Sequence, residues 1–109
     1  MEKVSTPKEF FNKILPNRFK PSQSEGVDIT VQINITDTNQ SWVVIIKNQN
    51  ITIEENTHPK PNLELIISEK NFLDIVNGKI SAEKAFFSGK AQLKGSIALA
   101  LKLKEAGFF

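Results

Sequence analysis

The chain is most restricted by what it lacks. It has no cysteine, which excludes disulfides, thiolate metal sites and cysteine nucleophiles. No apolar run approaches the eighteen or so residues that a membrane-spanning helix needs. Arg18 is the only arginine, and the net charge is only +2, so the sequence does not predict a nucleic-acid-binding groove.

The charge is unevenly distributed along the 109 residues. Residues 1–69 carry 7 basic and 9 acidic side chains, whereas residues 70–109 carry 7 basic and 3 acidic ones. The excess of basic side chains in residues 70–109 predicts at most a weak contact with anionic membrane surfaces or anionic ligands. The first residues lack the apolar segment of a signal peptide, and the last residues are not a peroxisomal Ser-Lys-Leu address. We therefore expect a soluble, cytoplasmic protein.

The first half predicts one helix and three strands. Thr6 can cap a helix that has Pro7 at its first position, and Pro16 should end that helix. Residues 27–36 alternate strictly between apolar and polar side chains, which predicts a strand with one buried face. Residues 41–47 and 51–54 predict two more strands. The turns between these three strands are short, so the strands should pair antiparallel.

The second half predicts short apolar elements separated by glycines. After a proline-containing loop at 55–62, a strand is expected at 63–67. Ser68 and Ser81 can each cap a short helix, which Gly78 and Gly89 respectively can close. A strand at 91–94 and a helix from Ser96 to Gly107 complete the chain. This division of apolar surface into small pieces suits a pocket for a hydrophobic ligand.

Residues 61–103 combine a strand ending in Ser68 with Phe72, Gly78-Lys79, Ala85-Phe86, and the run from Gly89 to Gly95 before a final apolar helix. With these features the segment resembles the sterol carrier protein type 2 family. The first 60 residues match by element order and by Trp42. The chain departs from the family at residues 48–50, where a glycine-rich turn is usual, and at Pro61-Asn62, where Ala-Asp is common.

The resemblance implies an α+β fold, with a five-stranded, mostly antiparallel sheet covered on one face by helices that enclose an apolar tunnel. It implies a single domain over residues 1–109 that binds a fatty acid, an acyl-coenzyme A or a sterol-like lipid. It implies neither covalent chemistry nor a cofactor. The sequence agrees, because His58 has no nucleophile or metal ligand near it in sequence and the carboxylates show no catalytic pairing.

The candidate lining consists of large apolar side chains from the predicted strands and helices. Ala82, Ala85 and Phe86 share one helical stripe, so we expect Phe86 to point inward and Phe87 toward a mouth or partner. Phe108 and Phe109 could form a lid. The full set is Trp42, Phe72, Ile75, Val76, Phe86, Leu93, Ile97, Leu101, Phe108 and Phe109.

Two readings of these residues remain open. Phe72, Ile75, Val76 and Phe86 could instead pack in an ordinary core, and Phe108 and Phe109 could be a disordered tail. The final helix is apolar nearly all round, which fits either a central core helix or a helix with one face on the sheet and another on a ligand or a second subunit. The chain is therefore expected to be a lipid carrier or, alternatively, an interaction module with a filled core that forms a homodimer or packs on a larger complex.

Overall fold

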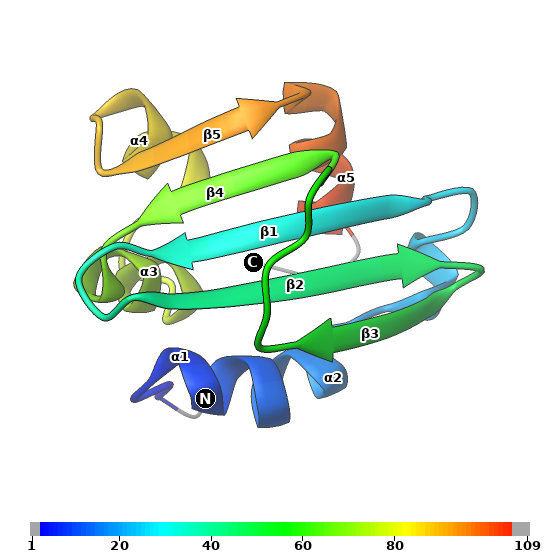
Figure 1. The fold of residues 1–109 in the computed structure, drawn as a ribbon, viewed down its shortest axis with the longest axis horizontal. Coiled ribbons are helices and arrows are strands. Elements are labelled where there is room, and N and C mark those ends of the chain that lie inside the picture. Colours follow the sequence, from blue (N-terminus) through cyan, green and yellow to red (C-terminus); the bar gives the residue numbers. More distant parts are fainter. Residues whose placement is uncertain (1–2, 106–109) are drawn as a thin grey trace.

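The computed structural model describes residues 3–105, which form one five-stranded sheet and several short helices (Figure 1). The helical elements are α1 (Pro7–Glu9), η1 (Phe10–Ile14), α2 (Leu15–Arg18), η2 (Pro21–Gln23), α3 (Glu69–Val76), α4 (Ala82–Phe87) and α5 (Ile97–Glu105). The strands are β1 (Ile29–Ile35), β2 (Gln40–Lys47), β3 (Asn50–Glu54), β4 (Leu63–Ile67) and β5 (Ala91–Gly95). The predicted α+β class and five-stranded sheet are confirmed.

The sheet has the order β3-β2-β1-β4-β5, with β1 at its centre. The pairings β1–β2, β2–β3 and β4–β5 are antiparallel, and β1–β4 is parallel. The turn between β2 and β3 places Asn48 and Gln49 at positive φ, as the central residues of a tight hairpin require. The segment 55–62 then crosses in front of β2 and β1 to reach β4 (Figure 1).

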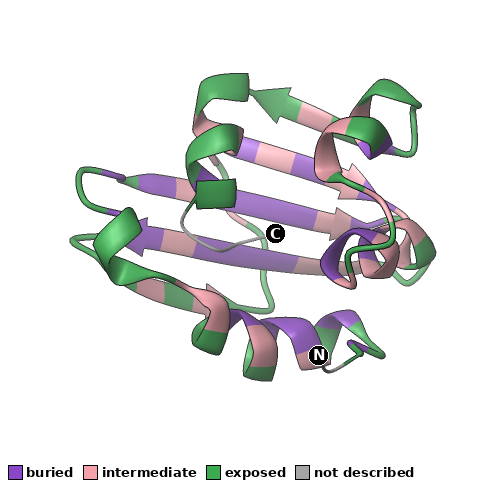
Figure 2. Ribbon diagram, turned by 180° about the vertical axis from the view of Figure 1, so that it is seen from behind, coloured by how far each residue is buried: buried purple, intermediate pink, exposed green. Residues whose placement is uncertain are grey.

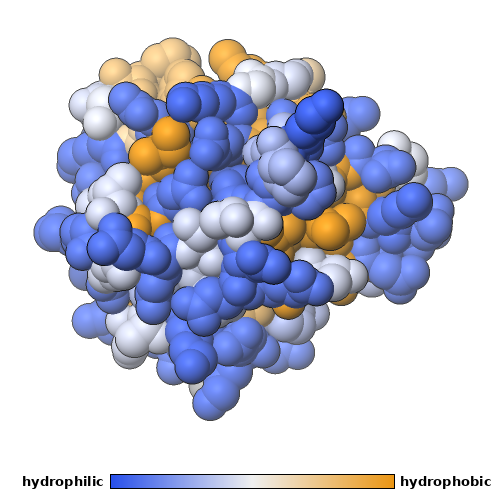
Figure 3. Space-filling model, in the orientation of Figure 1, coloured by the Kyte–Doolittle hydropathy of each residue, from blue (hydrophilic) through white to orange (hydrophobic). Residues whose placement is uncertain are grey.

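The two faces of the sheet differ because side chains alternate along each strand. Ile33 of β1 is level with Trp42 of β2 and Leu65 of β4, and these buried side chains lie on the helix-covered face. Figure 2 shows the helices together on that side. The opposite face is largely hydrophilic (Figure 3).

Gln32 attaches the crossing segment to this opposite face. Its side chain is buried, accepts a hydrogen bond from the His58 backbone N–H at 2.7 Å, and donates to the Asn56 carbonyl at 3.2 Å. His58 Nδ1 also accepts from the Lys60 backbone N–H at 3.1 Å. The only histidine of the sequence thus holds the conformation of this loop.

The prediction that Pro16 ends the first helix is wrong, because the helix continues to Arg18. Residues of η1 form a π-helical turn in which the Leu15 N–H donates to the carbonyl of Phe10, five residues earlier. Such a turn is wider than an α-helical one. It therefore provides room for the proline ring, which would otherwise clash with the carbonyl four residues before it.

Four aromatic side chains form the centre of the core. Phe11 stacks on Trp42 at a ring-centroid distance of 4.8 Å and on Phe72 at 5.4 Å, and Phe10 meets Phe11 edge-on at 5.3 Å. All four are buried. Arg18 lies over the Phe10 ring and donates to the Val76 carbonyl at 2.9 Å, which connects α2 to α3.

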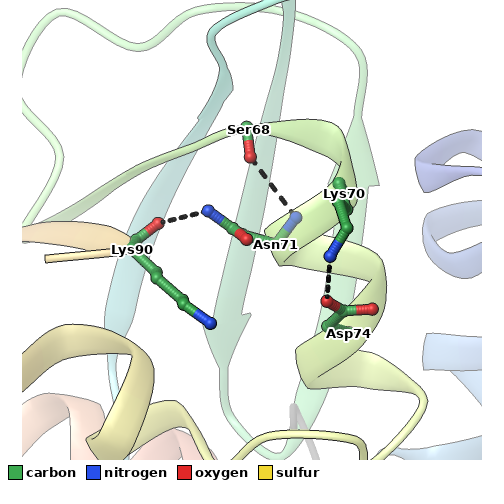
Figure 4. Close-up of polar contacts among 5 residues, drawn as sticks. All are labelled: Ser68, Lys70, Asn71, Asp74 and Lys90. Carbon is green, nitrogen blue, oxygen red and sulfur yellow. Dashed lines mark hydrogen bonds and ion pairs between the residues drawn. The ribbon is translucent and has the colours of Figure 1, made fainter. Parts of the chain in front are cut away.

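The two predicted serine caps are present at the helices of the second half. Ser68 accepts from the Asn71 N–H at the start of α3, and Ser81 accepts from the Lys84 N–H at the start of α4. The Asn71 side chain also donates to the Lys90 carbonyl at 3.2 Å (Figure 4). This hydrogen bond joins α3 to the residue that precedes β5.

An ion pair lies on the exposed side of α3. Lys70 donates to Asp74 at 3.0 Å, one helical turn away (Figure 4). That hydrogen bond lowers the pKa of the Asp74 carboxyl below its usual value. Because the lysine side chain is exposed, the pair adds little to stability.

Gly95 ends β5 at a point where the backbones of β4 and β5 meet closely. Its φ is +124°, and a Cβ at this position would lie 2.5 Å from the Asn62 carbonyl oxygen. Only glycine fits such a conformation and such an approach. Gly95 therefore fixes the place from which α5 turns back over the sheet.

Candidate ligand pocket

An apolar pocket of about 160 Å³ lies between α4 and α5, above β4 and β5. Both helices are on the same face of the sheet (Figure 2). Ten of the twelve side chains that line the pocket are apolar. They are Leu65, Ile75, Ala82, Phe86, Phe87, Ala91, Leu93, Ile97, Ala100 and Leu101, and the two charged ones are Glu83 and Lys104.

The floor of the pocket comes from the sheet. Leu65 of β4 is level with Leu93 of β5, so both side chains point to the helix-covered face. Ala91 is level with Ile67 two residues away and points in the same direction. The small side chain of Ala91 leaves space above the strand, which larger residues would fill.

One wall is α4, whose two phenylalanines differ in exposure. Ala85 is fully buried and attaches the helix to the core, and Phe86 is half-buried. Phe87 is 84% exposed, and its ring meets that of Phe86 edge-on at 5.7 Å. The inward and outward orientations expected for this pair agree with the structure.

The other wall is α5, which has two apolar sides. Leu103 is buried in the core, with Leu99 packed against it. Ile97, Ala100, Leu101 and Lys104 follow helical spacing along the pocket side. Ile97 is 61% exposed and Leu101 is 51% exposed. The alternative of a central core helix is therefore wrong, because one apolar side of α5 faces the pocket and solvent.

Glu83 and Lys104 join the two walls. Lys104 Nζ donates to Glu83 Oε1 at 2.9 Å, and the two side chains are 50% and 43% exposed, respectively. This hydrogen bond lowers the pKa of the Glu83 carboxyl, so the residue is ionised at neutral pH. The two charged groups that line the pocket in the described part of the chain therefore pair with each other.

The structure brings together half of the predicted lining residues. Ile75, Phe86, Leu93, Ile97 and Leu101 line the pocket. Trp42, Phe72 and Val76 lie instead in the packed core, where Trp42 and Phe72 contact Phe11. These three are therefore core positions in the structure, and their predicted contact with a ligand stays a prediction. Phe108 and Phe109 lie outside the described residues.

The sequence reasoning missed seven lining residues. Leu65 could have been found from the alternation of its strand, and Ala100 and Lys104 from their spacing with Ile97 and Leu101. Ala82 and Phe87 lie on a predicted helix and Ala91 lies on a predicted strand, but none of the three was assigned to the lining. Glu83 had no sequence signal, because its partner lies 21 positions away.

Comparisons with known proteins identify the family. The sequence model of the SCP-2 sterol transfer family matches residues 11–106, so the chain belongs to this family. The predicted resemblance is confirmed.

Several relatives are similar over part or most of the chain. Peroxisomal multifunctional enzyme A of Dictyostelium discoideum is 37% identical over 65 residues, which is 59% of this chain and 15% of that protein. Human sterol carrier protein 2 is 33% identical over 64 residues, which is 12% of its length. The Caenorhabditis elegans non-specific lipid-transfer protein-like 1 is 27% identical over 94% of this chain and 79% of its own.

Solved structures share the fold. The sec-alkylsulfatase Pisa1 of Pseudomonas sp. matches with a TM-score of 0.84 at 20% identity, covering 97% of this chain and 17% of that protein. The palmitated SCP2L2 of Aedes aegypti matches with a TM-score of 0.59 at 23% identity, covering 84% and 88%. The matches thus cover only 12–17% of the Dictyostelium enzyme, human sterol carrier protein 2 and Pisa1, but 79% of the Caenorhabditis elegans protein and 88% of the Aedes aegypti protein.

Two features of the described residues, 3–105, bear on other kinds of site. None of their helices is long and apolar enough to cross a bilayer. Within the same residues, no three side chains among His, Asp and Glu gather where they could hold a metal ion.

Proposed function

We propose that this chain binds a lipid with a long apolar part, such as a fatty acid, an acyl-coenzyme A or a sterol-like molecule, and carries it without chemical change. The observation that supports this most is the apolar pocket between α4 and α5 in a chain of the SCP-2 sterol transfer family. The similarity to a non-specific lipid-transfer protein-like chain over 94% of the sequence supports it further.

The size of the pocket sets a condition on binding. Its volume is about 160 Å³. An engineered apolar cavity of about 150 Å³ in another protein accommodates benzene, a far smaller molecule than a lipid. A long acyl chain needs more space, so we infer that α4 and α5 move apart on uptake. Phe87 of α4 and one side of α5 are exposed, so moving these two helices apart breaks few packing contacts. Opening here would also create the predicted tunnel.

The energy of binding would come mainly from burial of the chain. Each methylene contributes about 0.8 kcal/mol, from which the costs of ordering and association are subtracted. Because this contribution has no direction, it discriminates weakly among apolar chains. Glu83 and Lys104 are the charged lining residues among residues 3–105, and they could add preference for a headgroup.

Displacement of a fluorescent fatty acid tests this proposal. We expect the full chain to bind the probe with a Kd of about 1 μM or tighter, and an unlabelled fatty acid to compete for the same site. Native mass spectrometry of the freshly purified protein should show a co-purifying lipid. Absence of both probe binding and lipid would contradict the proposal.

A second candidate function rests on the exposed apolar side chains around the pocket. Phe87, Ile97 and Leu101 together could be covered by a second copy of the chain or by a larger complex. In that case light scattering would report a dimer mass that does not change with concentration, and the fluorescent fatty acid would not bind. The predicted role of Phe108 and Phe109 as a lid or interface stays a prediction.

A weak contact with anionic membranes belongs to the same proposal. Lys84 on α4, Lys90 between α4 and β5, and Lys94 on β5 are exposed and close in sequence to the exposed Phe87. We expect sedimentation with anionic vesicles to fall as salt rises, because charges are screened beyond about 8 Å at physiological ionic strength. Equal sedimentation with neutral and anionic vesicles at low and high salt would contradict this contact. A cytoplasmic location also stays a prediction.

A further inference from the structure

The charged groups of the pocket suggest which headgroup the ligand carries. Of the twelve lining residues, Glu83 and Lys104 alone are charged, one on each wall. Their hydrogen bond of 2.9 Å lies beside otherwise apolar side chains. A hydrophobic ligand that fills this pocket would therefore lie next to the ion pair.

The pair is suited to exchange of partners. Both side chains are about half exposed, so water solvates each charge when the pair separates. Exposed ion pairs contribute little to stability. Another carboxylate that reaches Lys104 can therefore replace Glu83 at little cost, and the released Glu83 side chain becomes solvated.

The position of Lys104 on α5 also gives the ligand an orientation. Ile97, Leu101 and Lys104 lie on the pocket side of one helix, with the lysine nearest the C-terminal end. Ile97 and Lys104 are seven residues apart, which is about 10 Å along the helix axis. An apolar chain lying along this side would place its terminal anion at Lys104 and extend toward Ile97.

We propose that Lys104 binds the carboxylate of an acyl-chain ligand by taking the place at which Glu83 now accepts its hydrogen bond. This rests on the proposed function. Glu83 is then an internal competitor of the ligand, and Lys104 distinguishes a free fatty acid from an uncharged lipid. A methyl ester of the same chain carries no negative charge, so it neither replaces Glu83 nor gains from Lys104 when the two helices move apart.

The test compares a long-chain fatty acid with its methyl ester, using the full chain and single substitutions. Glu83→Gln removes the competitor, so the acid should bind about threefold more tightly, whereas Lys104→Gln should weaken binding of the acid about fivefold. Binding of the ester should change less than about twofold in both variants. Lys104→Arg should restore most of the preference for the acid.

Lys102→Gln is the matched control. Lys102 is exposed on the same helix, does not line the pocket, and carries the same charge. Its substitution should leave binding of the acid unchanged, and thermal melting checks that all variants fold. If Lys104→Gln behaves like Lys102→Gln, or if acid and ester shift equally, the inference is overturned while the proposed function stands. If neither ligand binds the unmodified chain, both fail.

Discussion

Phe11→Ala is expected to lower the free energy of unfolding by about 3–5 kcal/mol, the usual cost of removing a fully buried phenylalanine. The Phe11 side chain is fully buried and stacks on Trp42 at 4.8 Å and on Phe72 at 5.4 Å. It thereby joins the N-terminal helical segment, the sheet and α3. Its removal leaves a cavity that these three elements cannot fill without moving apart.

Phe87→Ala is the matched control for this substitution. Phe87 is 84% exposed, so its removal should change the free energy of unfolding by less than about 0.5 kcal/mol. Urea denaturation of the three proteins gives both values. A loss of less than about 1 kcal/mol in Phe11→Ala would mean that the aromatic cluster is not the centre of the core.

The strands could be predicted from the sequence because their pattern is local. The alternation of residues 27–36 places Ile29, Ile33 and Ile35 on one face, and all three are buried in β1. The lateral order of the strands depends on pairings between distant segments. No residue pattern within β1 or β4 therefore indicates that these two strands pair in parallel. The helix end predicted at Pro16 was wrong because the π-helical turn before it accommodates the proline ring, and no residue pattern in the sequence predicts such a turn.

The site could be predicted only in part, for a related physical reason. Apolar periodicity indicates that a side chain is buried, but it does not indicate which neighbour covers it. Ile75 and Val76 are both buried at the end of α3, yet only Ile75 faces the pocket. To predict the Glu83–Lys104 pair, one needs to know how α4 and α5 lie relative to each other, and the sequence alone does not show this.

Ala100→Trp is expected to weaken binding of a fluorescent fatty acid at least about tenfold. Ala100 lines the pocket from α5, and its methyl group leaves space that an indole ring would fill. The ring would occupy the volume that the acyl chain needs and remove the corresponding burial of methylenes. Overpacking can itself cost about 1–3 kcal/mol of stability, so thermal melting accompanies the measurement.

Ala98→Trp introduces the same side chain on the same helix, at an exposed position that does not line the pocket. Titration of the fluorescent fatty acid into the unmodified chain and these two variants measures directly whether the space between α4 and α5 is the lipid site. We expect Ala98→Trp to bind within about twofold of the unmodified chain and Ala100→Trp to lose binding. Equal affinity in all three proteins, with both variants folded, would place the lipid elsewhere and contradict the central claim.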